Sequence, residues 1–169
     1  MEVILIRHGE PRYDEVDRHT RGDFGRLTAR GAKQAEARAS DPRLEGATLI
    51  VSSPYTRSLQ SAAIISRITD LPLEIEHDLR EWTADVKYQF DYDGEEAYKE
   101  YIKFKGKLNK ISKFRYETYE SVQKRVRNAI EKYEQSHEKI IVVCHGIVMS
   151  SQTFFEDLIE HCGVRAINI

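Results

Sequence analysis

The sequence predicts a three-layer α/β/α sandwich, in which helices cover both faces of a mainly parallel central sheet. Short, continuous runs of apolar and β-branched residues recur along the chain, as is typical of strands that are buried on both faces. Segments with apolar residues at helical spacing lie between these runs, and such alternation is typical of βαβ units. The 169 residues fit one domain of ordinary size and can bury a sizeable core.

Five segments are candidates for strands. Residues 3–6, 47–51 and 140–144 are the continuous apolar runs that indicate buried strands. Residues 71–75 alternate more between apolar and polar side chains, which favours a position nearer an edge of the sheet. The tail, residues 161–169, is a candidate for one last strand.

Three helices are expected between these strands. Thr28 can cap a helix that runs to residue 39, because a threonine hydroxyl accepts a hydrogen bond from the first turn. Pro54 suits the first turn of a second helix, which is expected to run to about residue 68. Residues 117–135 carry apolar side chains at helical spacing and predict a third helix.

Residues 83–116 interrupt the alternation and are rich in tyrosine, lysine and acidic residues. We expect them to form an insertion, or cap, over one end of the sheet, with a helix over residues 94–107. The whole chain, residues 1–169, is therefore expected to be a single domain. Residues 99–115 carry many lysines among aromatic residues, which suggests a nucleic-acid patch as one alternative. The simpler interpretation is an amphipathic cap whose lysines face solvent.

Composition argues against several kinds of partner. The formal net charge is −2, so overall charge gives no reason to expect binding to nucleic acid or to a membrane surface. The N-terminus does not have the pattern of a signal peptide, and no apolar stretch approaches the ~20 residues of a membrane span. Cys144 and Cys162 are the only two cysteines and form no disulfide framework, which favours a reduced, cytoplasmic setting.

Chemically versatile side chains follow several of the expected strands at the point where each strand ends. Ligands of open α/β sheets bind beyond the carboxyl ends of the strands, so these side chains are expected to converge. Taken singly, each has an ordinary interpretation, such as a helix cap, a solvated arginine or a turn. It is their shared placement after the expected strands that indicates a functional site. The set comprises Arg7, His8, Arg57, Glu81, His145 and Gly146.

This set is suited to phosphoryl transfer. Two guanidinium groups can hold the oxygens of a phosphate and also disfavour the charged form of a nearby imidazole. A neutral imidazole can attack phosphorus, and a second one can donate to a phosphoryl oxygen in the transition state. A glutamate whose pKa is raised by bound phosphate can protonate the leaving oxygen and later activate water. No metal and no cofactor is needed for these roles.

The same segments resemble the histidine phosphatase superfamily, the group that includes the cofactor-dependent phosphoglycerate mutases. The resemblance implies that His8 is the phosphorylated nucleophile, that Arg7, Arg57, His145 and Gly146 bind phosphate, and that Glu81 is the proton donor. It spans nearly the whole chain in the family's order, through Leu5-Ile6-Arg7-His8-Gly9-Glu10, Leu27-Thr28-Ala29-Arg30-Gly31, Ser52-Ser53-Pro54-Tyr55-Thr56-Arg57, Leu79-Arg80-Glu81 and Val143-Cys144-His145-Gly146.

The loop after the first strand departs from the family's pattern. Asp14 stands where many relatives carry an asparagine that helps to bind phosphate, and a carboxylate there would repel phosphate unless it were protonated or turned away. Residues 21–26 do not match the family either. Arg12 and Arg21 are candidate extra anion contacts, although solvated loop arginines are the simpler interpretation.

The resulting hypothesis is a metal-independent phosphatase that acts on a small phosphorylated substrate. His8 attacks phosphorus while Glu81 protonates the departing alcohol, and water then hydrolyses the phosphohistidine. A phosphomutase would share this chemistry, but the mutases of the family tend to be longer. A family member that binds a phosphorylated ligand without turnover is a third possibility. The sequence leaves the identity of the phosphate ester open.

Overall fold

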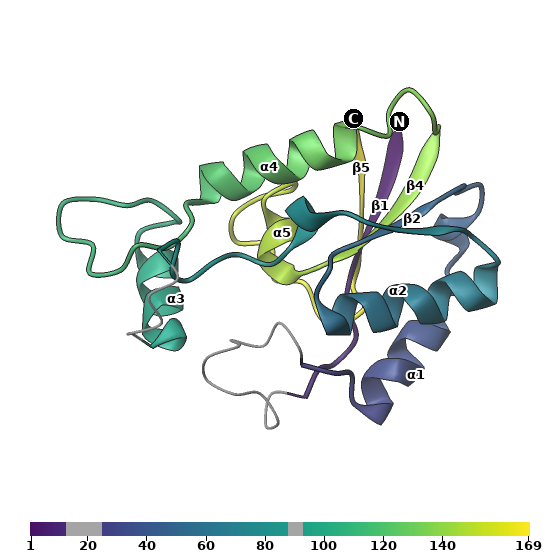
Figure 1. Ribbon diagram of the computed structural model, residues 1–169, viewed down its shortest axis with the longest axis horizontal. Helices are drawn as coiled ribbons and strands as arrows, with labels where there is room; N and C mark the ends of the chain where they lie inside the picture. Colours follow the sequence, from purple (N-terminus) through teal and green to yellow (C-terminus); the bar gives the residue numbers. More distant parts are fainter. Residues whose placement is uncertain (13–24, 88–92) are drawn as a thin grey trace.

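The computed structural model describes residues 1–12, 25–87 and 93–169, and it contains a five-stranded sheet in the order β3-β2-β4-β1-β5 (Figure 1). Four strands run parallel to one another, and the last one, β5, is antiparallel to β1. The three-layer α/β/α sandwich expected from the sequence is confirmed. The strands are β1 (Glu2–Arg7), β2 (Ile50–Ser52), β3 (Leu73–Ile75), β4 (Lys139–Cys144) and β5 (Val164–Asn168).

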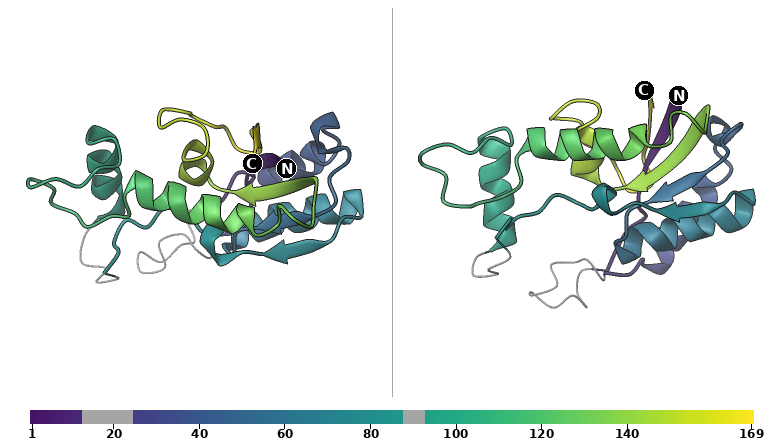
Figure 2. Two further views of the ribbon diagram at one scale, coloured as in Figure 1. Left: turned by 90° about the horizontal axis from the view of Figure 1, so that it is seen from above. Right: turned by 45° about the horizontal axis from the view of Figure 1, so that its top comes forward.

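Helices cover both faces of this sheet (Figure 2). On one face, α4 (Tyr119–Glu131) and the short α5 (Gly146–Ser150) pack on the odd-numbered side chains of β1. On the other face, α2 (Thr56–Thr69) packs on the even-numbered ones, and α1 (Ala29–Arg38) lies against α2. The side chains of the central strands are therefore buried on both sides, which explains the continuous apolar runs in the sequence.

Several boundaries differ from the sequence-based expectation. Pro54 does not lie in the first turn of α2, because the helix begins at Thr56 with Tyr55 as its cap residue. The second strand begins at Ile50 and not at residue 47. Thr28 does cap α1, since its hydroxyl accepts a hydrogen bond from the Gly31 amide at 2.9 Å. The expected edge position of β3 is also confirmed.

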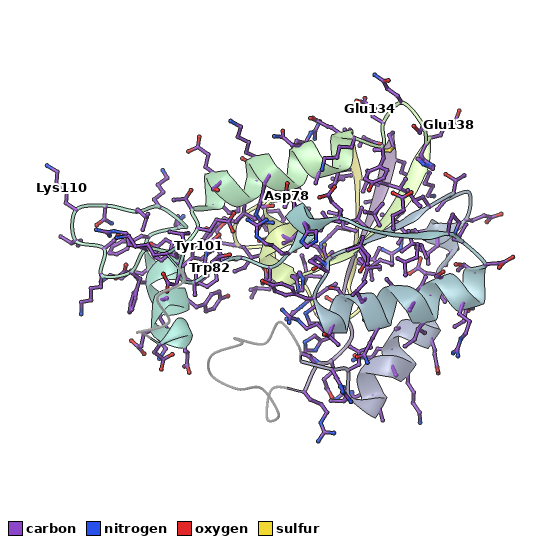
Figure 3. All side chains as sticks on the ribbon, in the orientation of Figure 1. Asp78, Trp82, Tyr101, Lys110, Glu134 and Glu138 are labelled. Atoms are coloured by element: carbon purple, nitrogen blue, oxygen red, sulfur yellow. The ribbon has the colours of Figure 1, made fainter. Side chains whose placement is uncertain are left out.

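The region of residues 83–116 contains one helix, α3 (Gly94–Lys103), which ends earlier than expected. Its buried side chains, Ala97 and Tyr101, face an aromatic cluster that also contains Trp82 (Figure 3). The lysines lie outside, where Lys99 forms ion pairs with glutamates of its own helix. This arrangement agrees with an amphipathic cap. We define the aromatic cluster as Trp82, Tyr98, Tyr101, Tyr116 and Phe155.

Candidate active site

The two histidines lie beside each other because their strands are neighbours. Arg7, the last residue of β1, is in register with Cys144, the last residue of β4. The His8 amide donates to the Cys144 carbonyl at 3.0 Å, so His8 and His145 leave the sheet at the same level. Their ring centroids are 5.2 Å apart. The convergence that the sequence predicted is therefore produced by the parallel pairing of β1 with β4.

His8 is only 2% exposed, and hydrogen bonds set the roles of its two ring nitrogens. Its Nδ1 lies 2.7 Å from the Gly9 carbonyl oxygen, which can only accept, so Nδ1 carries the proton. Its Nε2 accepts from Nε of Arg57 at 3.1 Å. Burial and the positive charge of Arg57 lower the pKa of His8 well below its usual 6.5. The imidazole is therefore neutral, with the lone pair on Nε2.

Arg57 reaches this position from the first turn of α2 and is itself buried. Its guanidinium carbon lies 5.2 Å from the centroid of the Tyr55 ring. Ser61, one turn later, accepts from the Gly9 amide at 3.0 Å and donates to the Arg57 carbonyl at 2.8 Å. The start of α2 is thus tied to the loop that follows His8, which holds the arginine and the histidine in a common frame.

Gly9 allows a close approach between that loop and α1. A Cβ atom at Gly9 would lie 2.3 Å from the Gly31 carbonyl oxygen, and a Cβ atom at Gly31 would lie 2.2 Å from the Glu10 carbonyl oxygen. Neither position can accept a side chain without a backbone shift. The glycine after His8 therefore has a packing reason that is independent of any ligand.

His145 is fully buried at the carboxyl end of β4. Its Nε2 lies 2.7 Å from the Ser53 hydroxyl, while its Nδ1 is buried without a hydrogen-bond partner among the described residues. Burial, followed by the charge of Arg57, lowers the pKa of His145 well below its usual value. If the Ser53 hydroxyl donates to Nε2, the proton of the neutral ring sits on Nδ1 and is available to a ligand.

Arg7 completes the positive side of the site. One of its terminal nitrogens donates to the Ile159 carbonyl, and its Nε is a second buried donor without a partner in the described part of the chain. Gly146, the first residue of α5, lies beside the guanidinium, since a Cβ atom there would be 3.7 Å from Cζ of Arg7. A phosphate contact by Gly146 stays a prediction.

Glu81 also belongs to this group, and its carboxyl group accepts from the Trp82 amide at 2.9 Å. Burial raises the pKa of Glu81 above its usual 4.5, while Arg57 and Arg7 partly oppose that shift. The sequence argument attributed such a shift to bound phosphate. The structure supplies a different cause, because loss of hydration raises the pKa before any anion arrives. We call Arg7, His8, Arg57, Glu81 and His145 the strand-end cluster.

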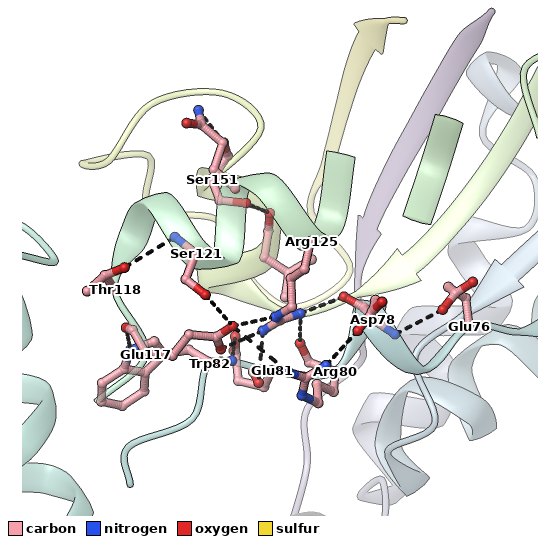
Figure 4. A network of polar contacts seen from close by, with 12 residues as sticks. Glu76, Asp78, Arg80, Glu81, Trp82, Glu117, Thr118, Ser121, Arg125 and Ser151 are labelled. Carbon is pink, nitrogen blue, oxygen red and sulfur yellow. Dashed lines mark hydrogen bonds and ion pairs between the residues drawn. The ribbon is translucent and has the colours of Figure 1, made fainter. Parts of the chain in front are cut away.

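Arg125 holds the segment that carries Glu81 (Figure 4). Its guanidinium group forms two hydrogen bonds with the Glu117 carboxylate, at 2.6 and 2.9 Å. The same group donates to the backbone carbonyls of Asp78, Arg80 and Glu81, at 2.5, 2.9 and 3.3 Å. The ion pair between Arg125 of α4 and Glu117 therefore holds three backbone carbonyls within residues 78–81, and Arg125 is a positioning residue for Glu81.

Three of these positions were missed or set aside by the sequence analysis. Ser53 was interpreted as part of a turn, Arg125 was not singled out, and His161 was not linked to the site. The ring of His161 lies 5.7 Å from that of His8. Arg125 and His161 reach the site from outside the parallel strand ends, so the rule about strand termini could not find them.

Three candidates from the sequence remain, namely Arg12, Asp14 and Arg21. Arg12 is exposed, and its amide donates to the Arg26 carbonyl at 2.7 Å. Asp14 and Arg21 lie outside the described residues. Within residues 1–12, 25–87 and 93–169, no three His, Cys, Asp or Glu side chains are grouped as metal ligands would be, and no helix is long and apolar enough to cross a membrane. Metal independence and the absence of nucleic-acid partners stay predictions.

Comparison with known proteins defines the class to which this fold and cluster belong. The family model of the histidine phosphatase superfamily (branch 1) matches residues 3–153. The chain is therefore a member of the histidine phosphatase superfamily.

Its relatives include phosphatases and mutases by name. Phosphoserine phosphatase 1 of Hydrogenobacter thermophilus is 28% identical over 166 residues, which cover 88% of this chain and 72% of that protein. A probable phosphoglycerate mutase, GpmB of Proteus mirabilis, is 33% identical over 89 residues, which cover 53% of this chain and 41% of the mutase.

Solved structures share the fold over nearly the whole chain. Bacillus stearothermophilus YhfR superposes with a TM-score of 0.73 at 19% identity and covers 99% of this chain and 91% of its own. The alpha-ribazole phosphatase from Shigella flexneri superposes with a TM-score of 0.70 at 20% identity, covering 100% of this chain and 91% of that one. At these identities the likeness concerns the fold.

Proposed function

We propose that this protein is a phosphatase that hydrolyses a phosphate monoester through a phosphohistidine on Nε2 of His8. The observation that carries the proposal is a set of buried polar atoms without hydrogen-bond partners, which an anion could supply. Nδ1 of His145 and Nε of Arg7 have no hydrogen-bond partner among the described residues, and both lie beside the neutral His8. Buried donors are almost always paired, so their shared ligand is expected to be rich in acceptor oxygens.

In the first step, Nε2 of His8 forms a bond to phosphorus as the bond to the ester oxygen breaks. The phosphoryl oxygens replace Nε2 as the acceptor for Arg57, which frees the lone pair for attack. Glu81, protonated because its pKa is raised, transfers its proton to the departing alcohol. The Gly9 carbonyl keeps the proton of His8 on Nδ1, away from the reacting nitrogen.

In the second step, water attacks the phosphohistidine. Glu81, now a carboxylate, accepts a proton from the water as the new oxygen–phosphorus bond forms and the nitrogen–phosphorus bond breaks. Inorganic phosphate leaves, and His8 and Glu81 return to their starting protonation states. Arg7, Arg57 and His145 stabilise the charge on the phosphoryl oxygens in both steps.

Hydrolysis is preferred to mutase activity because the relative that covers most of this chain bears the name of a phosphatase. The shorter match to mutase-named relatives keeps phosphomutase activity as the alternative. Under the same proposal, residues 1–169 form one domain, with residues 83–116 as a cap, and the protein works in the cytoplasm on a small phosphorylated molecule.

Labelling of His8 tests the proposal most directly. The purified protein, incubated with a ³²P-labelled monoester, is expected to carry acid-labile label and to release inorganic phosphate. His8→Ala is expected to lose both, whereas His137→Ala, whose ring bonds to Thr48 at the opposite end of the sheet, keeps both. Hydrolysis of 4-nitrophenyl phosphate by His8→Ala at the wild-type rate would contradict the mechanism. Label transfer to a second alcohol without phosphate release would favour the mutase.

A further inference from the structure

A cavity of about 810 Å³ opens from the strand-end cluster toward the cap. It meets the cluster at Arg7, which is proposed to hold the phosphoryl group, and at Glu81, the proposed proton donor. Its other walls come from α3, the start of α5 and the loop of residues 155–160. Because Glu81 is the proposed proton donor, the group that leaves with the ester oxygen is expected to occupy this cavity.

Aromatic rings form one wall of the cavity. Tyr101 lies at the centre, with ring centroids 4.9 Å from Trp82, 5.5 Å from Phe155 and 6.4 Å from Tyr98. All four rings line the cavity. A wall of this kind offers an inserted ring offset-stacked and edge-to-face contacts.

Apolar side chains are also exposed around the opening. Ile102 on α3 is 44% exposed and Leu158 is 87% exposed, and both line the cavity. Single exposed apolar residues are common on protein surfaces, but these two line the same cavity as the aromatic wall. Contiguous apolar surface of this kind marks binding sites.

The charges around the cavity disfavour a second anion. Glu156, Asp157 and Glu160 line it, and within the described residues Arg7 is the only lysine or arginine that does so. Arg7 faces the transferred phosphoryl group. Lys105 and Arg165 already pair with Glu156 and Asp157, at 3.2 and 2.6 Å, and neither cation lines the cavity. On the walls formed by described residues, a carboxylate or second phosphate of the leaving group would therefore find no lysine or arginine other than Arg7.

One polar atom is placed to recognise the substrate. The Tyr101 hydroxyl is buried and has no hydrogen-bond partner among the described residues. Burial, followed by the charge of the nearby Glu81, raises the pKa of Tyr101, so the hydroxyl stays protonated and can donate. Because Tyr101 lines the cavity, we expect a bound ligand to supply the missing partner of this buried donor.

We propose that the substrate is a phosphate monoester of an alcohol that carries an apolar ring and no second anionic group, with the ring held by the aromatic cluster. This inference rests on the proposed function for the direction in which the alcohol leaves. It makes phosphorylated hydroxy acids poor substrates, because among the described lining residues only Arg7 is a cation and the phosphoryl group occupies it. It also supplies a physical reason to prefer hydrolysis over a phosphoglycerate mutase reaction.

Binding can be measured without turnover because Trp82 is the single tryptophan of the chain and lines the cavity. Its fluorescence is followed while 2-phenylethylphosphonate, ethylphosphonate or 2-carboxyethylphosphonate is added. These probes share the phosphonate and the two-carbon linker. The phenyl compound is expected to bind about ten-fold or more tightly than ethylphosphonate, and the carboxylate compound more weakly than either. Equal affinities, tighter binding of the carboxylate compound or no binding of any probe would overturn the substrate class.

A pair of exposed isoleucines provides the matched variants. Ile102→Lys places a cation on the cavity wall and is expected to reduce the preference for phenyl over carboxylate by about three-fold, the size of a surface ion-pair effect. Ile111→Lys makes the same change at a residue that is exposed but does not line the cavity. An equal loss of preference in both variants would contradict the assignment of this wall.

The two proposals fail in different ways. Tight binding of 2-phenylethylphosphonate without any phosphorylation of His8 would sustain the pocket and contradict the catalytic mechanism. Turnover of the matching ethyl, phenylethyl and carboxyethyl phosphates at equal kcat/KM, with His8 labelled, would sustain the mechanism and contradict the pocket.

Discussion

His8 and His145 of the strand-end cluster are almost wholly buried, whereas Ile102 and Leu158, which line the neighbouring cavity, are 44% and 87% exposed. The strand-end cluster is held by parallel strand pairing and by hydrogen bonds to buried backbone groups. Residues 93–116 are held by ring contacts and by ion pairs at the surface, such as Lys105 with Glu156 at 3.2 Å. The strand-end cluster, which buried hydrogen bonds hold in place, is suited to a chemical step that all substrates share. The region around the aromatic cluster is suited to selecting the alcohol.

Replacement of Glu81 is expected to produce the largest effect of the variants that follow. Glu81→Gln keeps the size of the side chain but cannot transfer a proton, so kcat for an alkyl phosphate is expected to fall by about 10²–10⁴-fold. The fall should be much smaller for 4-nitrophenyl phosphate, whose leaving group needs no proton. An equal loss for both esters would show that Glu81 is not the proton donor.

The same residues set the pH dependence. His8 must be neutral to attack, so kcat/KM is expected to decline on the acidic side through a pKa below 6.5. Glu81 must be protonated to donate, so kcat/KM declines on the alkaline side through a pKa above 4.5. Glu81→Gln should remove the alkaline decline and leave the acidic one. A profile of unchanged shape in that variant would contradict the assignment.

Arg125 connects the two regions, and its replacement is expected to have the next largest effect. Arg125→Gln leaves the buried Glu117 carboxylate without its bidentate partner and three carbonyls without a donor, at a cost of about 3–5 kcal/mol in the free energy of unfolding. The positive charge of Arg125 also lowers the pKa of Glu81, so the alkaline decline in kcat/KM should move to higher pH.

A matched control for this variant lies on the same helix. Arg127→Gln removes an exposed pair with Glu131 and is expected to change the free energy of unfolding by about 0.3–0.5 kcal/mol, with no shift in the pH profile. Arg125→Lys should restore part of the stability and the charge. If Arg125→Gln lowers the melting temperature while the alkaline pKa stays in place, Arg125 is structural only.

The smallest effects are expected from removing the hydroxyl group of either of two buried tyrosines in the aromatic cluster. Tyr101→Phe removes a hydroxyl without a partner, so stability should change by less than about 0.5 kcal/mol while KM rises for a substrate that can accept from it. Tyr116→Phe removes a donor to the Lys107 carbonyl at 2.9 Å and should cost about 1 kcal/mol without affecting KM. The opposite pattern would place the recognition role on Tyr116.

The sequence by itself determined the layer architecture and the membership of the strand-end cluster. Buried parallel strands need continuous apolar runs, and residues that directly follow such strands must meet at one edge of the sheet. The element boundaries were less accurate, as the start of α2 shows. Pro54 is compatible with a first helical turn, but the chain stays extended until Tyr55 because Ser53 is held by β4 and His145.

Only the tertiary structure decided the pKa shifts within the strand-end cluster, the support of Glu81 and the walls of the neighbouring cavity. Burial, which no local pattern specifies, lowers the pKa of His8 and raises the pKa of Glu81. Arg125 is far from Glu81 in sequence, but from its position on α4 it donates a hydrogen bond to the Glu81 carbonyl. The aromatic wall of the cavity likewise gathers Trp82, Tyr101 and Phe155 from three separate segments, because packing in three dimensions depends on contacts that sequence spacing does not encode.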